Sequence, residues 1–402
     1  MSLPIPKPLF SRFLIAFRLP LSAFFYAFLV IFRIFSPSHL HPTAPGSMNR
    51  QRIISIVKVT VTFLIVAFSI YFSVWKVDFS ELGRSFRTAN YWYALAIIIP
   101  IILSHYVRAV RWKIILERIH PAVRTGNLFA GVMIGYFMNN IIPRSGEFMR
   151  PWFTAQEEKD TSFSSLLGSI IVERFIDTVA LLLMIAAILL YDRNLFDGFE
   201  EVGVSAAVIR PIIYLAIVLG IGFILIAPSR AGLWIAETAS LPLEWIARRS
   251  GWTKLSALRN SVLEMFRKLQ LGFGAVRTPR QIVLVLFHTV LLYFLYMVPL
   301  WMMFSAFPSG SNPEVTIFAV LEIYVITALA YAIAPTPGAF GVFHAAARIA
   351  LVKFVAFTEA DAVAYATLTH FVNYIVPIVL GIYYLVARNM SFGSLLRARA
   401  QS

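Results

Sequence analysis

Cysteine is absent from this chain, and charged residues are scarce. None of the 402 residues is a cysteine and only 14% are Asp, Glu, Lys or Arg, whereas soluble domains contain about 25% charged residues. The absence of cysteine excludes disulfides, thiolate metal sites and a cysteine nucleophile. The scarcity of charge excludes a soluble fold of ordinary composition.

Signature motifs of catalysis are absent as well. The sequence contains no His-Glu-x-x-His motif, no phosphate-binding P-loop and no Gly-x-Ser-x-Gly motif, which argues against an autonomous enzyme. We expect no cofactor and no metal ion. The net charge of +15 would suggest nucleic acid in a soluble protein, but here we attribute it to loops that face anionic lipid.

Long apolar runs are what the chain does contain. Hydrophobic residues make up 59% of it and the mean hydropathy is +0.76. Several runs approach the roughly 20 apolar residues that cross a hydrocarbon core of about 30 Å. Because the runs are continuous, they predict helices and exclude a barrel. The expected fold class is therefore an all-α, polytopic membrane protein.

The first 47 residues differ from the rest. Their apolar stretch contains Arg18 and Arg33 and no clear small-residue cleavage site follows it, so it is a poor match to a signal peptide. The Asn-Arg-Gln-Arg sequence after Met48 leads directly into an apolar run, which is typical of a first transmembrane segment with a cytoplasmic N-terminus. We expect an extension, a transmembrane domain and a basic C-terminal tail, at residues 1–47, 48–390 and 391–402.

Loop charges orient the apolar segments. Residues 108–124 carry five basic and one acidic residue, and residues 228–280 carry nine basic and three acidic residues, so both loops should be cytoplasmic. Residues 191–210 carry four acidic and two basic residues and should be external. The expected segments are 53–75, 91–108, 126–142, 163–190, 211–227, 281–306, 315–334, 338–355 and 362–387.

This orientation creates a conflict at segment 126–142. Segment 91–108 ends inside and segment 163–190 must begin inside, so the segment between them cannot simply cross. A re-entrant hairpin resolves the conflict, with residues 143–146 at its tip and residues 147–160 returning.

Residues 315–355 are expected to form a second broken-helix hairpin. They start near external Glu314, end near external Glu359 and break at Pro335-Thr336-Pro337-Gly338. Two breaks that enter from opposite sides suggest an inverted repeat of the transporter type. The alternative is that residues 315–334 and 338–355 both cross fully.

The cytoplasmic stretch 228–280 has an amphipathic character. Apolar residues such as Trp245 and Trp252 alternate with basic ones, so we expect the stretch to lie on the membrane surface. It is too short and too simple to be a catalytic domain.

The first break carries polar residues at membrane depth. Arg144, Glu147 and Arg150 are candidates for a site, because ionisable groups there usually face a cavity or a partner. Ser145 as N-cap would leave a positive helix end pointing inward, where Arg144 beside it would attract a phosphate. The alternative is that the two arginines snorkel or pair with Glu147.

Glu173 and Asp177 place two carboxylates in the apolar segment 163–190. They share one helix face with Ser169, while Arg174 lies about 100° away. We favour structural ion pairs for these carboxylates, and the alternative is that one of them carries a proton. The candidate partners are Arg108, Arg111, Arg144 and Arg150.

The second break has the sequence of a helix start. Thr336 as N-cap and Pro337 as the first helical residue predict an inward-pointing helix end. Gly338 and Gly341 leave one face bare, so that a helix or a lipid chain can approach.

Two histidines follow the second break. His344 lies in segment 338–355, and His370, in the last segment, is its natural partner. A membrane histidine is more often a hydrogen-bonded structural residue than a proton carrier.

These motifs occur together in a recognisable order. They are Arg108-x-x-Arg111-Trp112, Asn139 four residues before Pro143-Arg144, Gly146-Glu147-x-x-Arg150, Glu173-Arg174-x-x-Asp177 and Pro335-x-Pro337-Gly338-x-x-Gly341. From about Met48 to Arg388 the chain resembles the lysylphosphatidylglycerol synthase transmembrane region family of flippase-like proteins. It has no soluble synthase domain.

The resemblance implies a lipid translocase in the bacterial inner membrane. The charge pattern places Met48 and the C-terminus on the cytoplasmic side. The cargo would be an anionic phospholipid or a polyprenyl phosphate-linked lipid, with Arg144 and Arg150 holding its phosphate. Alternatives are a lipid-modifying transferase and a scaffold for cell-envelope enzymes. This chain departs from the family where His344 and His370 stand in place of a Glu and an Arg.

The cysteine-free chain allows a direct test of the first hairpin. A single cysteine introduced as Asp160→Cys should be protected from an impermeant external thiol reagent in intact cells, because residues 143–162 are expected on the cytoplasmic side. The same residue should react after the membrane is permeabilised. Labelling from outside intact cells would contradict the re-entrant arrangement.

Overall fold

The computed structural model describes residues 77–158, 160–191, 230–250, 278–311, 315–333 and 336–390, with scattered positions in 60–75, 211–222 and 256–263. The expected extension and tail lie outside the described residues, and segments 53–75 and 211–227 lie largely outside them. The chain divides into two units, Met1–Phe68 and Ser69–Ser402. All the helices below belong to the second unit.

Every regular element in the described part of the chain is helical, as the apolar runs predict. The α-helices and two 3-10 turns are α3 (Phe79–Thr88), α4 (Tyr91–Ala96), α5 (Ile98–Leu116), α6 (Thr125–Ile141), α7 (Gly146–Glu157), α8 (Phe163–Tyr191), α11 (Arg230–Ala239), α12 (Leu241–Ser250), α14 (Pro279–Phe304), η2 (Pro308–Ser311), α15 (Ile317–Ile333), η3 (Pro337–Ala339), α16 (Val342–Val355) and α17 (Glu359–Ala387).

Local sequence signals fix several helix starts. At α14, Thr278 and Gln281 form a reciprocal capping box, with Pro279 at the first turn, where its missing N–H is not needed. At α17, the Thr358 hydroxyl accepts a hydrogen bond from the Asp361 amide at 3.2 Å. Both signals satisfy amide groups that a helix start leaves unpaired.

Five helices in the described residues are long and apolar enough to cross a membrane. The first continues eight residues beyond its expected end at Arg108, because Arg108 and Arg111 are buried against other helices instead of lying in a solvated loop. The five are Tyr91–Leu116, Phe163–Tyr191, Pro279–Phe304, Pro337–Val355 and Glu359–Ala387.

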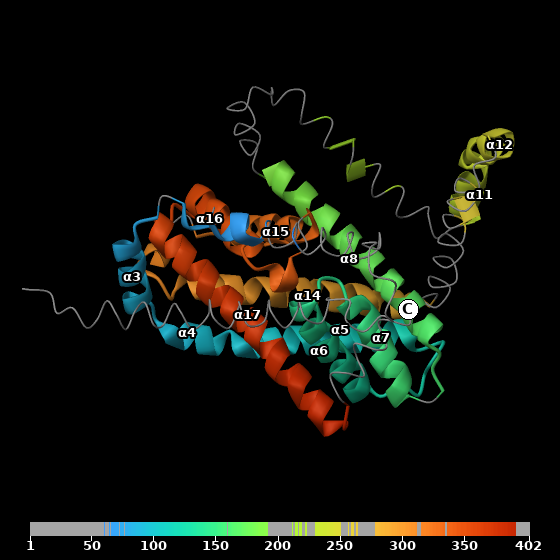
Figure 1. Ribbon diagram of the computed structural model, residues 1–402, viewed down its shortest axis with the longest axis horizontal. Helices are drawn as coiled ribbons and strands as arrows, with labels where there is room; N and C mark the ends of the chain where they lie inside the picture. Colours follow the sequence, from blue (N-terminus) through green and yellow to red (C-terminus); the bar gives the residue numbers. More distant parts are fainter. Residues whose placement is uncertain are drawn as a thin grey trace, which may run out of the picture. The chain divides into compact units, whose positions relative to one another are not determined.

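Helix α5 packs along α14, and Figure 1 shows the two helices running side by side. Helix α17 contacts α6 and α16, and α15 contacts α16. Large buried side chains such as Phe304 and Tyr365 fill the main apolar core beneath these helices. The site described below lies where α5, α7 and α8 meet.

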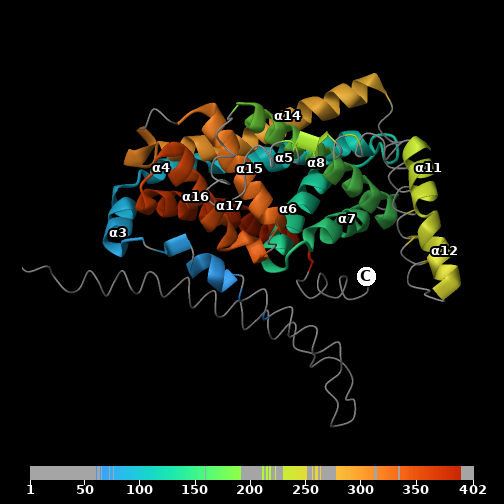
Figure 2. The ribbon, with the colours of Figure 1, turned by 90° about the horizontal axis from the view of Figure 1, so that it is seen from above.

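Helices α6 and α7 form the two arms of a hairpin (Figure 2). Two glycines set their separation: a Cβ on Gly135 would lie 3.1 Å from the Gly146 carbonyl oxygen, and a Cβ on Gly146 would collide with the Gly135 carbonyl. The sequence between the arms carries the break at Pro143-Arg144. The close approach brings Arg150 on α7 into the interior.

Thr336 is the N-cap residue and Pro337 the first helical residue, as expected, but the helix that they start is interrupted after one turn. Pro337 begins only a short 3-10 turn, and α16 starts at Val342 with Gly341 as its N-cap residue. Gly338, Ala339 and Gly341 have φ values of 55°, 56° and 77°, and this left-handed backbone cannot continue a right-handed helix. A Cβ on Gly338 would collide with the Tyr374 ring, so glycine is required there for space as well.

Replacing Gly146 with alanine should loosen the α6–α7 hairpin. The added methyl group has to displace backbone of α6, and overpacking of this kind typically lowers stability by about 1–3 kcal/mol. Gly168→Ala on α8 is the matched control, because nothing lies within 4 Å of a Cβ there. Thermal unfolding of both purified variants checks the expectation, and equal midpoints would contradict it.

Candidate functional site

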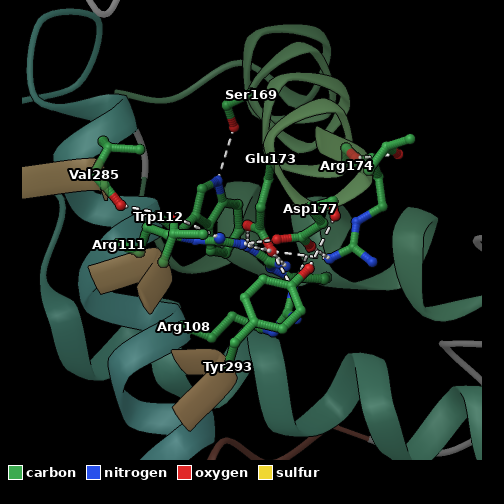
Figure 3. Close-up of polar contacts among 12 residues, drawn as sticks. Arg108, Arg111, Trp112, Ser169, Glu173, Arg174, Asp177, Val285 and Tyr293 are labelled. Carbon is green, nitrogen blue, oxygen red and sulfur yellow. Dashed lines mark hydrogen bonds and ion pairs between the residues drawn. The ribbon is translucent and has the colours of Figure 1, made fainter. Parts of the chain in front are cut away.

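Glu173 on α8 is fully buried and is the centre of an ion-pair network. It accepts hydrogen bonds from Arg108 on α5 and from both terminal nitrogens of Arg150 on α7. Arg111 Nη2 lies 3.5 Å from the same carboxylate. One carboxylate thus ties α5, α7 and α8 together, and Figure 3 shows several of these side chains pointing toward one another.

Asp177, one turn further along α8, is paired as well. Its carboxylate oxygens lie 2.6 Å from Arg111 Nη2, 2.8 Å from Arg174 Nη2 and 3.5 Å from Arg108 Nη1. Both carboxylates therefore have the arginine partners that the structural interpretation requires. We call this network the arginine cluster, and its members are Arg108, Arg111, Arg150, Glu173, Arg174 and Asp177.

Neutral side chains hold the arginines in place. The Tyr296 hydroxyl accepts from Arg108 Nη2 at 2.6 Å, and the Thr289 hydroxyl accepts from Arg111 Nη1 at 3.1 Å. The Arg150 guanidinium lies 3.9 Å from the centroid of the Trp112 ring, a cation–π contact that stabilises a buried cation. The Trp112 indole in turn donates to Ser169 Oγ at 2.8 Å.

The cluster has more positive than negative charge. Four guanidinium groups surround two carboxylates, which gives the cluster a net charge of +2. The side chain of Arg174 is 41% exposed, whereas those of Arg108, Arg111 and Arg150 are almost fully buried. The excess charge therefore has one accessible point, and an anion reaching Arg174 would reduce the imbalance.

The first break is organised by an asparagine. Asn139 Oδ1 accepts from the Gly146 amide at 2.7 Å, the role at the α7 start that we expected of Ser145. The Ser145 side chain makes no cap hydrogen bond, because its hydroxyl donates to the carbonyls of Met138 and Ile142 at 2.9 and 2.7 Å. Both residues join the end of α6 to the start of α7.

Arg144 and Glu147 lie apart from the arginine cluster. Arg144 is exposed, has a φ of 61° and donates from Nη2 to the Ala332 carbonyl on α15 at 3.1 Å. Glu147 is also exposed, and no ion pair between it and Arg144 or Arg150 is present in the described residues. The structure thus places Arg144 and Arg150, expected to act together, in different surroundings.

The two broken hairpins contact each other near Tyr374 of α17. Asn140 at the end of α6 donates to the Tyr374 carbonyl at 3.0 Å, and Gly338 of η3 lies against the Tyr374 ring. The hydrogen bond from Arg144 to the Ala332 carbonyl joins the first break to the end of α15. Residues of both breaks therefore meet at one junction.

His344 and His370 lie together beside this junction. Their ring centroids are 4.8 Å apart, and Phe340 and Phe343 pack against the rings. His344 Nδ1 and His370 Nε2 are buried without a hydrogen-bond partner. The two rings are therefore close enough to interact directly.

Several polar contacts could not be assigned from the sequence. Tyr296 and Thr289 support the arginines, and the Tyr293 hydroxyl donates to the Asp177 carbonyl at 3.0 Å. Their spacing along α14 places Tyr293 one turn from each of the other two, which is the signal that a helical projection would have given. Glu322 on α15 is a further buried carboxylate that sequence reasoning missed.

Within the described ranges, no group of three or more His, Asp or Glu residues is arranged to hold a metal ion.

Comparison with known proteins agrees with the arrangement of these motifs. The family model described as the lysylphosphatidylglycerol synthase transmembrane region matches residues 55–381, a range that contains the arginine cluster and both breaks. No solved structure matches the chain.

Two archaeal proteins are similar to the chain. A UPF0104 membrane protein of Methanocaldococcus jannaschii is 26% identical over 337 residues, which cover 82% of this chain and 94% of that protein. A UPF0104 membrane protein of Pyrococcus horikoshii is 23% identical over 153 residues, covering 37% of this chain and 46% of that protein.

Removing the central carboxylate should destabilise the fold. Glu173→Gln leaves Arg108 and Arg150 buried without their shared anion, and breaking a buried pair from one side typically costs about 3–5 kcal/mol. Glu81→Gln on α3 is the control, because Glu81 is exposed. Unfolding in detergent measures both. If Glu173→Gln unfolds at the same midpoint as Glu81→Gln, the arginine cluster does not hold the three helices together.

Proposed function

Since the chain belongs to the lysylphosphatidylglycerol synthase transmembrane region family and is an integral membrane protein, we propose that it is a translocase for an anionic lipid. The lipid is an anionic phospholipid or a polyprenyl phosphate-linked lipid. Its phosphate binds at the accessible side of the arginine cluster, while its apolar chains stay in the bilayer.

The net charge of the arginine cluster is the observation that carries this proposal. If the cluster had only a structural role, one carboxylate for each guanidinium would make it neutral. Insertion of an unbalanced Arg at the bilayer centre costs about 2.5–3.5 kcal/mol. A phosphate at Arg174 would offset this cost through charge-assisted hydrogen bonds. The partly exposed Arg174 provides the contact, and Arg108, Arg111 and Arg150 provide the positive potential behind it.

Helix lengths support a re-entrant first hairpin. At about 1.5 Å per residue, the 17 residues of α6 and the 12 residues of α7 extend roughly 26 and 18 Å, both less than a hydrocarbon core of about 30 Å. The second hairpin keeps its alternative, because Pro337–Val355 is by itself a candidate span. We propose that the two hairpins form an inverted repeat, because their breaks contact each other.

The enzyme alternative has less support from the geometry. Glu173 and Asp177 are both held by guanidinium groups, which stabilise the carboxylate form and weaken it as a base. A scaffold for cell-envelope enzymes remains the rival, and it predicts a cluster whose only effect is on stability. We place the translocase in the cytoplasmic membrane, with Met48 and the C-terminus on the cytoplasmic side.

The proposal predicts that Arg174→Gln weakens lipid binding while the fold persists. Losing one charge-assisted contact should cost on the order of 1.5–3 kcal/mol, or roughly tenfold to more than a hundredfold in affinity. Arg118→Gln is the matched control, because Arg118 is exposed outside the arginine cluster. Binding of phosphatidylglycerol and its movement between leaflets of proteoliposomes are the measurements, made on protein of wild-type unfolding midpoint.

The same assay tests whether Arg144 contributes to phosphate binding in addition to Arg174. Arg144→Lys keeps the charge but removes the planar fork that suits two phosphate oxygens, so a loss of binding there would make Arg144 a second contact. Wild-type binding and transport by Arg174→Gln would overturn the proposed site. If Arg144→Lys were also unimpaired, the translocase would rest on family membership alone.

A further inference from the structure

His344 on α16 and His370 on α17 form a pair that the proposed lipid site does not use. Their ring centroids are 4.8 Å apart and the ring planes are inclined by 55°. We call these two residues the histidine pair. It lies beside the junction of the two breaks, because the ring centroids of His370 and Tyr374 are 5.9 Å apart.

The histidine pair lacks the hydrogen bonds that a structural histidine makes. His344 Nδ1 and His370 Nε2 are buried and have no hydrogen-bond partner in the described part of the chain. Two other histidines differ in this respect, because His120 and His288 bond to a serine hydroxyl and to a backbone carbonyl at 2.6 and 2.7 Å. Buried polar atoms without a partner cost free energy, so the pair is incompletely satisfied as it stands.

One added proton would give both rings their missing partner. The proton would sit on the free nitrogen of one imidazole, which would then donate an N–H···N hydrogen bond to the free nitrogen of the other. A bond of this kind is charge-assisted and stronger than a neutral one. A second proton would place two like charges at this short distance, where they disfavour each other. The pair therefore suits one proton and not two.

Neutral groups surround the two rings. Phe340 and Phe343 pack against them. Tyr374 is the neighbouring titratable group on α17, and its carbonyl accepts the hydrogen bond from Asn140 at the end of α6. None of these side chains carries a charge that could compensate a protonated pair.

The charged residues of the neighbouring elements are engaged elsewhere. On α16, Arg348 lies one turn beyond His344 and is paired with Glu359 at the start of α17. Arg144 at the first break donates to a carbonyl of α15, and Glu322 is the one charged residue of α15. Within the described ranges, no carboxylate forms an ion pair with either ring of the histidine pair. A proton on the pair would therefore add one uncompensated positive charge.

An anionic lipid would supply the opposite charge. The phosphate of phosphatidylglycerol carries one negative charge, and moving a lone charge through the apolar core of a bilayer is costly. One lipid and one proton together are neutral, so crossing together reduces this cost for both.

We propose that the histidine pair is a proton-binding site, which holds one proton between His344 and His370, and that one proton crosses the membrane with each anionic lipid. The proton is taken from water on the acidic side and released to water on the other side, so no further reactant is needed. The coupling to lipid rests on the proposed function, but the binding of the proton does not.

Carbon-13 NMR of the histidine rings tests the binding of the proton. The full chain, labelled at histidine, is titrated with acid in phosphatidylcholine bilayers over the range in which it stays folded. The signals of His344 and His370 should change together, in one step that takes up a single proton. Rings that both stay neutral, or that take up two protons in independent steps, would contradict the site.

Two substitutions assign the signals and test whether the proton is shared. His344→Asn and His370→Gln place an amide group near the position of the free ring nitrogen, so they keep the shape of the pair but cannot take up a proton. In each variant the remaining histidine should stay neutral, because it has no second ring with which to share the charge. If the remaining ring still takes up the proton in the same step, the shared site is wrong.

Lipid distribution in proteoliposomes tests the coupling. A trace of acyl-labelled phosphatidylglycerol should accumulate about tenfold per pH unit in the leaflet on the alkaline side, because one proton moves with each lipid. A membrane potential should have no effect, because the lipid and the proton together are neutral. His370→Gln should abolish the accumulation. His288→Asn is the matched control and should retain it, because His288 lies on α14 and is bonded to a backbone carbonyl.

The outcomes separate this inference from the proposed function. If the wild-type protein equilibrates the lipid but does not accumulate it, or if His370→Gln accumulates it as the wild type does, the coupling is overturned. If the wild-type protein moves no lipid, the proposed function fails and the NMR titration alone decides the proton site. Arg174→Gln should slow the movement of lipid and leave the titration of the histidine pair unchanged.

Discussion

Compensation of buried charge is the constraint on which the rest of this structure depends. Glu173 is fully buried on an apolar helix, and a carboxylate there persists only if cations surround it. Arg108 and Arg150 supply them from two other helices, so the position of α7 relative to α5 and α8 follows from one side chain. The close glycine contact between α6 and α7 is what lets Arg150 reach it.

The same arginines connect structure to the proposed function. Two arginines would balance the two carboxylates, yet four surround them. Among the four, only Arg174 has a partly exposed side chain. A lipid phosphate would act as the missing counter-ion, present only while the site is occupied. On this account the arginine cluster is fully compensated only when it is loaded, which gives the protein a physical reason to bind an anionic head group rather than a neutral one.

The sequence predicted the helices well and the site in part. Apolar runs located α6, α8, α14 and α15 within a few residues, and the carboxylate pair on α8 predicted arginine partners. The assignment of Arg108 to a loop was wrong. In the sequence, an arginine at the end of an apolar run looks the same whether it lies in a loop or is buried against carboxylates of another helix. Without Arg108 and Arg111, the loop keeps fewer basic residues, among them Arg118 and Arg124. Its charge is therefore weaker evidence that the loop is cytoplasmic.

Other features depended on tertiary contacts that no local pattern encodes. Pro337 starts only a 3-10 turn, because the backbone at Gly338 and Ala339 is left-handed, and the Tyr374 ring leaves no room for a side chain at Gly338. Arg144 and Arg150 are only six positions apart, yet one is exposed and the other is buried against Trp112. Which of two nearby arginines enters the interior was decided by the fold of the α6–α7 hairpin.

The most direct test of the central claim is a measurement of proximity between lipid phosphorus and arginine nitrogen. Solid-state NMR can detect the phosphorus–nitrogen dipolar coupling in proteoliposomes that contain phosphatidylglycerol and protein labelled at its arginine side chains. A phosphate held by Arg174 predicts a coupling to a guanidinium nitrogen that disappears in Arg174→Gln and persists in Arg118→Gln. A coupling that is absent, or that is the same in both variants, would contradict the binding of a lipid phosphate by the arginine cluster.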